Sequence, residues 1–382
     1  MNGPAQKFND DVLAAESDRA VAEHAFPHIM HVLDFPELRE LLLAFDAPAK
    51  RAKRLRSLVG IVAIACGFAA LCGAPVALLY DKVFPEWSRP VAAVSASLGV
   101  VSLLLGIVGA LSGKSKQRWL SSRLMTERLR QFHFQAFACR LPSILASTRG
   151  PKGRNEFLGS RQVWLADFRL AFEGHLPAKL RSTLDDEAAE SVWLHPREEL
   201  APLPSGPDAT LLEVFAAYRV LRLEHQIQYA NYRIGTVDGS LFSAAGRQLQ
   251  WLRTCALSLI FVAFVINVGL AIVLWINPAS APALGGLSAV RGGASTIAQL
   301  HVFIIWLFVG IAATRTLEEG LQPAREVERF RRYRSVMLSL LKRFDAAADP
   351  REKVSIMRDA ERVAYQEMRD FLRTHDEASF VL

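Results

Sequence analysis

The sequence predicts an all-α integral membrane protein, with four transmembrane helices in two hairpins and a cytoplasmic helical bundle. Two observations lead to this fold class. Four stretches are uncharged over at least the roughly 20 residues that a helix needs to cross the hydrocarbon core of a bilayer. The rest of the chain is ordinarily charged: 51% of the 382 residues are hydrophobic, 22% are Asp, Glu, Lys or Arg, and mean hydropathy is +0.18.

The four stretches are residues 57–80, 90–113, 254–277 and 294–314. A buried helix of a soluble protein is rarely apolar on all sides over such a length. Small residues recur every four positions in the first two, at Ala65, Ala69, Gly73 and Ala77 and at Ser102, Gly106 and Ala110. Such stripes let helix backbones approach closely. We favour a tight hairpin within one chain as the cause, with a contact between subunits as the alternative.

Lysine and arginine flank the four stretches on one side. They are Lys50, Arg51, Lys53, Arg54 and Arg56 before the first, Lys114, Lys116 and Arg118 after the second, Arg247 and Arg253 before the third, and Arg315 after the fourth. Cytoplasmic loops are enriched in these residues. We therefore expect a multi-pass protein with both termini and the long middle segment in the cytoplasm. Trp306 lies in the middle of the fourth stretch, where we expect it to pack against another helix.

The sequence divides into three parts. Residues 1–145 contain a cytoplasmic helix, the first hairpin and a following helix. Residues 146–208 are a charged cytoplasmic segment that ends in a Pro-rich linker, and residues 209–382 contain the second hairpin and the C-terminal cytoplasmic helices. The two outer parts share one plan, in which a membrane hairpin is preceded and followed by cytoplasmic helices.

Local signals place the cytoplasmic helices. A helix begins near Pro36 and is expected to break at Pro48, and another spans residues 119–139 before Pro142. Residues 161–193 indicate two short helices, and Thr210 with Glu213 forms a capping-box pattern that opens a long one. Two C-terminal helices follow the fourth stretch. The first has an apolar seam at Phe330, Tyr333, Met337, Leu340 and Phe344.

Charged and aromatic residues recur on single helical faces beside the hairpins. They are Trp119, Arg123, Glu127 and Arg130 after the first hairpin, Tyr218, Arg222, Gln226 and Tyr229 before the second, and Glu361 and Glu367 near the C-terminus. These patterns resemble the SLATT-type membrane domains of bacteria. In that family a helix with an Arg…Gln…Tyr pattern precedes the hairpin, and helices with Trp, Arg and Glu positions follow it. The chain has Phe371 where the family often has Trp.

The resemblance implies a pore-forming or membrane-perturbing effector of a bacterial conflict or nucleotide-signalling system, such as anti-phage defence. It also implies a place in the bacterial inner membrane and a separate cytoplasmic sensing or signalling partner. Four helices of one chain cannot enclose a wide conduit, so a pore would require a homo-oligomer. The helical-face positions given above, apart from Tyr218, are then candidate residues for packing or gating.

No enzyme motif emerges, and we expect neither an enzyme activity nor a cofactor. The chain lacks GxxxxGK[ST], HExxH and GxSxG. His24, His28 and His31 lie close together but lack a clear third ligand for a metal. The formal net charge of +7 comes from cations beside the apolar stretches, and no zinc-finger or RNA-binding signature indicates nucleic acid.

Two glutamates fall near apolar helical faces. A carboxylate at Glu127 or Glu361 needs a cationic partner, because an unpaired buried charge is costly or changes its protonation. Arg123 and Arg222 are the natural partners. We favour a structural ion-pair network, which would specify how helices pack. The alternative is a switch that reports a cytoplasmic signal.

Three polar residues lie inside the apolar stretches, where they are costly in lipid and often face a water path. For Asn267, pore lining and interhelical hydrogen bonding are equal alternatives. Gln299 and His301 are two residues apart and point to different faces of one helix. For these two we favour hydrogen bonding within the hairpin.

Three functions remain from the sequence. The first is the oligomeric pore-forming effector, gated through its cytoplasmic helices. The second is a non-conducting membrane scaffold that recruits a cytoplasmic partner. The third, which we favour least, is an enzyme with an unrecognised site, since no cluster of a nucleophile with a base or of metal ligands emerges.

Overall fold

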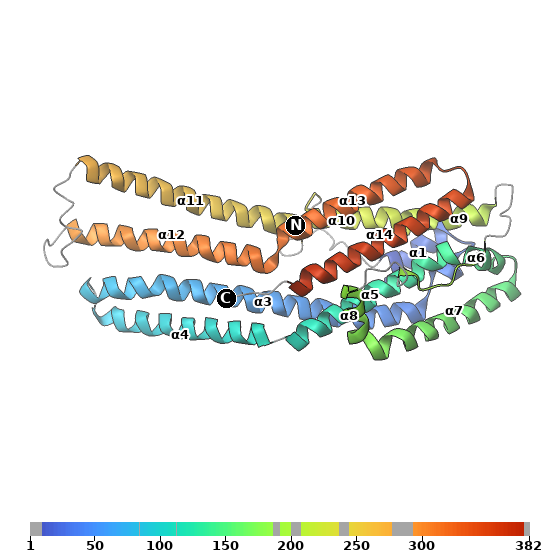
Figure 1. The fold of residues 1–382 in the computed structure, drawn as a ribbon, viewed down its shortest axis with the longest axis horizontal. Helices are drawn as coiled ribbons and strands as arrows, with labels where there is room; N and C mark the ends of the chain where they lie inside the picture. Colours follow the sequence, from blue (N-terminus) through green and yellow to red (C-terminus); the bar gives the residue numbers. More distant parts are fainter. Residues whose placement is uncertain are drawn as a thin grey trace. The chain divides into compact units, whose positions relative to one another are not determined.

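The computed structural model describes residues 10–83, 85–111, 113–185, 192–199, 208–236, 244–276 and 293–377. These residues are almost entirely helical and contain no strand, which confirms the all-α prediction (Figure 1). The α-helices are α1 (Glu16–Ala25), α2 (Met30–Leu33), α3 (Pro36–Val83), α4 (Pro85–Leu111), α5 (Gly113–Cys139), α6 (Leu141–Ser147), α7 (Pro151–Phe172), α8 (Leu176–Asp185), α9 (Ala209–Tyr218), α10 (His225–Ile234), α11 (Ala245–Ile276), α12 (Gly293–Leu321), α13 (Pro323–Ala346) and α14 (Pro350–Glu377). Short turns of other helix types are η1 (Asp10–Val12), η2 (Glu173–His175) and η4 (Arg219–Glu224).

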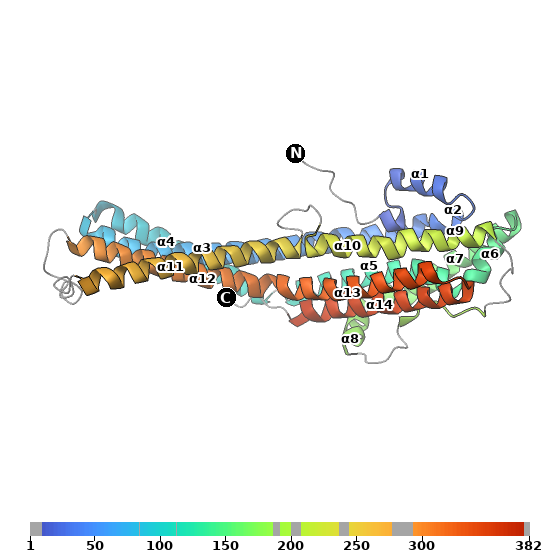
Figure 2. The ribbon, with the colours of Figure 1, turned by 90° about the horizontal axis from the view of Figure 1, so that it is seen from above.

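The chain forms two compact units from interleaved segments. The described parts of the first unit lie within residues 10–53, 114–236 and 325–377, and those of the second within 54–113 and 244–324. Each unit therefore takes segments from both halves of the sequence. In Figure 2, α13 and α14 lie side by side within the first unit, as α11 and α12 do within the second.

Three helices of the described chain are long and apolar enough to cross a membrane. The candidate spans of these helices lie within Met30–Val76, Glu86–Gly109 and Ala245–Gly269, and they overlap the first three predicted spans. The fourth predicted span, 294–314, forms most of α12, but the prediction of four spans exceeds what the structure shows. The described side chains of α12 begin at Val302. The 18 residues from there on include Arg315, Glu318 and Glu319, which are too many charges for a membrane span of that length.

Small residues bring α3 and α4 together in the second unit. Ser102 Oγ donates a hydrogen bond to the carbonyl oxygen of Ala63 at 2.8 Å, and a Cβ on Gly67 would lie only 2.9 Å from that hydroxyl. A Cβ on Gly73 would meet Ser95 Oγ at 2.0 Å. The predicted close hairpin is thus present, although the stripe on the first helix is displaced.

Two residues of the predicted first stripe do not reach this contact. Ala65 and Ala69 are exposed, whereas Ala63 is buried and Gly67 and Gly73 face α4. Spacing of four drifts around a helix that has 3.6 residues per turn, so a stripe of that spacing leaves the contact face within a few turns.

Helix α12 packs against both α3 and α11 within the second unit. The indole Nε1 of Trp306 donates a hydrogen bond to the carbonyl oxygen of Cys72 on α3 at 2.8 Å. A Cβ on Gly310 would lie 3.2 Å from Leu259 on α11 and 3.6 Å from Phe68 on α3. The expectation that Trp306 packs against another helix is confirmed, and the two hairpins contact each other in one chain.

Helix α5 lies at the centre of the first unit. No residue from 119 to 139 is exposed, so this part of α5 is covered on every side. One apolar cluster joins Phe134 to Tyr218 on α9 and Met357 on α14, and another joins Leu129 to Leu42 on α3. Each fully buried large apolar side chain contributes about 1.5–3 kcal/mol. The predicted seam of α13 is also confirmed, because Phe330, Tyr333, Met337, Leu340 and Phe344 are all buried.

Two predicted helix boundaries are wrong. Pro48 does not break its helix, since α3 continues from Pro36 to Val83. Burial of Leu42 and Ala49 on either side of Pro48 offsets the hydrogen bond that a proline removes. The described part of the segment 161–193 contains two helices, as predicted, but the first, α7, already begins at Pro151 and is therefore longer than expected; the second is α8.

The predicted end of α5 and the predicted start of α9 are confirmed, although another residue caps α9. Helix α5 ends at Cys139, before Pro142, as predicted. Helix α9 begins where the capping-box pattern lies, but its cap is Asp208, whose carboxylate accepts hydrogen bonds from the backbone N–H groups of Thr210 and Leu211 at 2.9 and 3.3 Å. Helix α10 ends at Gly235, whose φ of 86° places it in the left-handed region that favours glycine.

Candidate functional site

The most buried ion pair of the first unit joins η4 to α14. Arg222 donates from Nε to Glu361 Oε1 at 2.8 Å and from Nη2 to Oε2 at 2.9 Å. The exposed fractions of these two side chains are 2% and 0%. Tyr218 donates a further hydrogen bond to Glu361 Oε1 at 2.9 Å, and the ring of Phe134 lies 4.8 Å from the guanidinium carbon. Glu361 therefore has the cationic partner that its place in an apolar seam requires.

A π-helical turn presents Arg222 to this pair. The turn η4 is six residues long and lies between α9 and α10. π-helical turns inside α-helices occur frequently at functional sites. Arg219 begins the turn and contacts the surface residues Asp345, at 2.7 Å, and Glu224, at 2.6 Å. The turn thus places one arginine in the core and another at the surface.

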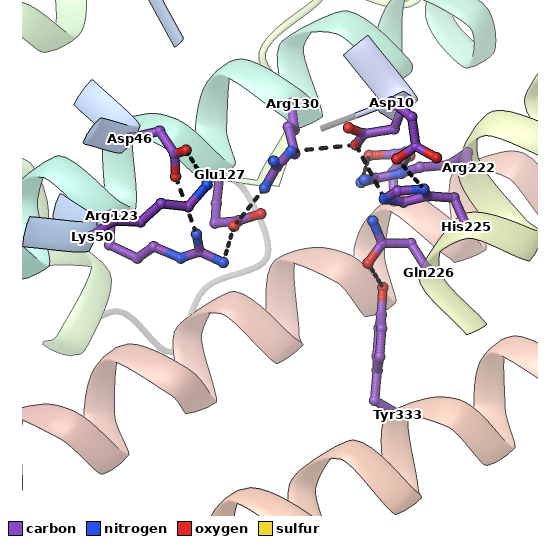
Figure 3. A network of polar contacts seen from close by, with 12 residues as sticks. Asp10, Asp46, Lys50, Arg123, Glu127, Arg130, Arg222, His225, Gln226 and Tyr333 are labelled. Carbon is purple, nitrogen blue, oxygen red and sulfur yellow. Dashed lines mark hydrogen bonds and ion pairs between the residues drawn. The ribbon is translucent and has the colours of Figure 1, made fainter. Parts of the chain in front are cut away.

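A second set of ion pairs alternates in charge from α3 through α5 (Figure 3). Asp46 on α3 contacts Arg123 at 4.0 Å, and Arg123 contacts Glu127 at 2.5 Å. Glu127 then accepts from Arg130 at 3.1 Å, and Arg130 lies 3.3 Å from Asp11 of η1. Figure 3 shows Arg123, Glu127 and Arg130 following one another along α5. They connect the N-terminal segment and α3 to the central helix.

The charges of this set continue onto α10 and α3. His225 Nδ1 lies 3.2 Å from Asp10, and its Nε2 lies 4.0 Å from Asp11. At the other end, Lys50 pairs with Asp46 at 2.5 Å. Burial raises the pKa of Asp10, and the nearby His225 lowers it by less.

A third cluster surrounds Glu326 at the start of α13. Its carboxylate contacts Arg233 of α10, His375 of α14 at 3.2 Å and Lys53 of α3 at 3.7 Å. Burial alone would raise the pKa of Glu326, but the attraction of Arg233 and Lys53 exceeds this effect and holds the pKa well below its ordinary value. Glu326 is therefore ionised at neutral pH.

Glu367 of α14 differs from Glu326. It contacts Arg329 at 3.3 Å, and burial raises its pKa more than this arginine lowers it. Burial also raises the pKa of Tyr218 well above its ordinary value, and the neighbouring Glu361 adds to the shift. The Tyr218 hydroxyl therefore stays protonated and serves as a donor to the carboxylate.

All nine predicted packing or gating residues lie in the first unit. Of these, Arg123, Glu127 and Arg130 belong to the alternating set, and Arg222 with Glu361 forms the central pair. Trp119 packs edge-on against Phe371 and His375, Gln226 accepts a hydrogen bond from Tyr333 at 3.2 Å, and the ring of Tyr229 lies 5.6 Å from that of Phe330. Glu367 pairs with Arg329. The structure thus forms both Arg–Glu pairs expected from the sequence, Arg123 with Glu127 and Arg222 with Glu361.

Sequence reasoning missed several buried partners of these residues. They are Asp11, Asp46, Tyr218 as a donor, Glu326 and Arg329. Asp11 is 119 residues from Arg130, and a pair so distant leaves no periodic signal in one sequence. The apolar neighbours of Asp46 at Leu42 and Ala49 are the one local sign that its carboxylate is buried.

The polar residues of the predicted spans are only partly described. Asn267 is exposed, and its Nδ2 donates to the carbonyl oxygen of Ala263 on the same helix at 2.7 Å. This bond satisfies the donor without a second helix. The side chains of Gln299 and His301 lie outside the described residues, so their predicted roles stay predictions.

Two of the three N-terminal histidines, His28 and His31, bond to different partners. His28 bonds to Glu213, and His31 is buried and bonded to Ser147 Oγ at 2.7 Å. His24 is exposed. Within the described ranges, no group of three His, Cys, Asp or Glu side chains is arranged to hold a metal ion.

We compared the chain with protein-family models, characterised proteins and solved structures, and none of them matches it. The site must therefore be interpreted from its own geometry. That geometry is a buried network of ion pairs in which each carboxylate faces an arginine, lysine or histidine. Breaking such a pair on one side costs about 3–5 kcal/mol, so the network strongly selects one arrangement of helices.

Proposed function

We propose that this protein is a membrane effector that forms an oligomeric pore or otherwise perturbs the bilayer, and that its first unit gates it. In this proposal the four apolar stretches cross the bacterial inner membrane as two hairpins, with both termini in the cytoplasm. The resemblance to SLATT-type domains supports a role in a conflict or nucleotide-signalling system. A cytoplasmic sensor or signalling protein would supply the activating signal.

One observation carries the gating proposal: buried ion pairs join the segments that adjoin the apolar helices in the chain. Asp46 precedes the first apolar stretch on α3, and Arg123 follows the second. Arg233 precedes the third, and Glu326 follows the fourth. A signal that rearranges these pairs would act on all four apolar helices at once. Interfaces of this kind support switching because they have discrete arrangements.

The test measures membrane potential with a voltage-sensitive dye in cells that express the protein from an inducible promoter. We expect wild-type protein to depolarise the cells and Asn267→Leu to weaken the effect, because an exposed polar side chain would leave the pore wall. Val268→Leu is the matched control, since Val268 is also exposed and already apolar. It should leave depolarisation unchanged.

A constant potential despite confirmed insertion, with the sensor component co-expressed, would count against a pore. The protein would then be better described as a non-conducting scaffold that recruits a cytoplasmic partner. The full-length protein would in that case still bind that partner. A protein that neither depolarises cells nor binds the partner would refute both proposals.

A further inference from the structure

A largely non-helical segment, Val192–Glu199, lies against α5, and we call it the strap. Side chains of α5 bond to its backbone. The carbonyl oxygen of Val192 accepts hydrogen bonds from Arg128 Nη1 at 3.1 Å and from Gln135 Nε2 at 2.9 Å. The backbone N–H of Leu194 donates to Gln135 Oε1 at 2.8 Å. One glutamine amide therefore binds a carbonyl and an N–H two residues apart, as a neighbouring strand would.

The second half of the strap is held by the C-terminal turns of α5 and by α6. His195 Nε2 donates to the carbonyl oxygen of Phe132 at 2.8 Å, and the N–H of Glu198 donates to that of Cys139 at 2.9 Å. The Glu198 carboxylate accepts from Arg140 Nη1 at 2.9 Å and from Ser143 Oγ at 2.7 Å. The carbonyl of Cys139 lies in the last turn of α5, where carbonyls lack intrahelical partners, and is therefore available as an acceptor.

The strap covers a face of α5 that carries buried polar groups, which the strap satisfies, and we call this covered face the groove. Gln135 has an exposed fraction of 0%, and both ends of its amide bond to the strap. An unsatisfied buried amide costs about 1–3 kcal/mol. The groove therefore selects a peptide with three features: a carbonyl and an N–H two residues apart, a small buried ring donor at the position of His195, and a carboxylate at that of Glu198.

We propose that this groove is a peptide-recognition site that binds the strap of a second copy of this chain as well as its own. The second copy fits because its identical sequence presents the same donors, acceptors and carboxylate, so exchange of straps preserves every contact. The inference rests on the homo-oligomer of the proposed function and names the contact between its subunits.

The connections limit where exchange can occur. Six residues, 186–191, join the strap to α8, and eight, 200–207, separate it from Asp208. Fully extended, these connections reach at most about 22 and 29 Å. Only copies held next to each other could exchange straps over such a distance. Confinement to a shared membrane supplies that proximity, and the strap of the same chain competes as a tethered ligand at roughly millimolar effective concentration.

The first experiment tests the groove without any measurement of ion flux. Fluorescein-labelled peptide 191–200 is titrated into the full-length protein in detergent and followed by fluorescence anisotropy. A strap variant, His195→Ala with Glu198→Ala, should bind it at least about tenfold more tightly than wild type, because the internal competitor is weakened. Adding Ser143→Ala should reduce this binding, since the peptide carboxylate loses a donor. A folded strap variant, judged by circular dichroism, that binds no peptide would overturn the proposal.

The second experiment identifies the occupant. Trp193 is half-buried in the strap, and we replace it with the photoreactive amino acid p-benzoylphenylalanine in membranes of expressing cells. Irradiation should yield a covalent dimer linked to α5 of the other copy, and Ser143→Ala should reduce its yield. Crosslinks confined to single chains would overturn binding in trans. A dimer crosslink in a protein that never depolarises cells would uphold this inference while refuting the pore.

Discussion

The pair formed by Arg222 and Glu361 should be the most sensitive ionic contact of the first unit. Replacing Arg222 with Met leaves the Glu361 carboxylate buried, with the Tyr218 hydroxyl as its remaining donor among the contacts described above. Loss of one partner from a buried pair costs about 3–5 kcal/mol. For a domain of about 150–250 residues, each kcal/mol corresponds to about 2–4 °C in Tm, so we expect a decrease of about 6–20 °C.

The double variant separates the cost of the unpaired charge from the value of the contact. Arg222→Met with Glu361→Leu removes both charges, and buried pairs replaced by apolar side chains are often neutral or more stable. Tyr218 keeps a second acceptor, the carbonyl oxygen of Met357 at 3.1 Å. We therefore expect the double variant to recover most of the Tm that Arg222→Met loses.

Thermal unfolding of the purified protein in detergent, followed by near-ultraviolet circular dichroism, measures both effects. Arg219→Met is the matched control: it lies on the same turn, but the side chains of its pair with Asp345 are 35% and 45% exposed. Such a pair contributes about 0–1 kcal/mol. Equal Tm decreases in Arg222→Met and Arg219→Met would refute the argument from burial, as would a double variant less stable than either single one.

Two further predictions concern pH and helix packing. Burial lowers the pKa of His133 and of His195 to about 4, so the folded protein binds fewer protons than the unfolded chain between pH 4 and 6.5. The free energy of unfolding therefore contains the full contribution of these histidines above pH 6.5 and decreases toward pH 4, by about 3 kcal/mol for each histidine. Urea unfolding at several pH values measures how steeply the free energy of unfolding changes with pH, and His133→Phe should make this change smaller. In the second unit, Gly73→Ala should lower the free energy of unfolding by about 1–3 kcal/mol, because the added methyl overpacks against Ser95. Gly109→Ala, with open space around its Cβ position, should leave it unchanged, and equal effects would contradict the close approach of α3 and α4.

The helices could be predicted from sequence because their signals are local. Long apolar runs and the seam of α13 need only a window of one or two turns. The continuation of α3 through Pro48 could not, because the burial that outweighs the proline comes from distant segments. The place of Asp208 as the cap of α9 was two residues from the predicted pattern, a typical error at helix ends.

The candidate site divides in the same way. Both predicted arginine–glutamate pairs form, but only Arg123 and Glu127 are neighbours on one helix. Arg222 and Glu361 are 139 residues apart, and their pairing could be suggested only by the need of a buried carboxylate for a cation. Asp11 was missed because it stands in a short turn whose burial has no helical periodicity.

Helix α5 explains why periodicity alone does not predict the first unit. From residue 119 to 139 it is covered on all sides, yet polar side chains occur around its whole circumference. Several polar positions contact different segments: Arg130 contacts the N-terminal turn through Asp11, Gln135 binds the strap, and Arg128 both binds the strap and lies 5.0 Å from the ring of Tyr365 on α14. An apolar α5 could bury the same area against these segments in several registers. With distinct polar partners, each segment has one place on α5, and one segment can be released by a competing ligand while the others stay bound.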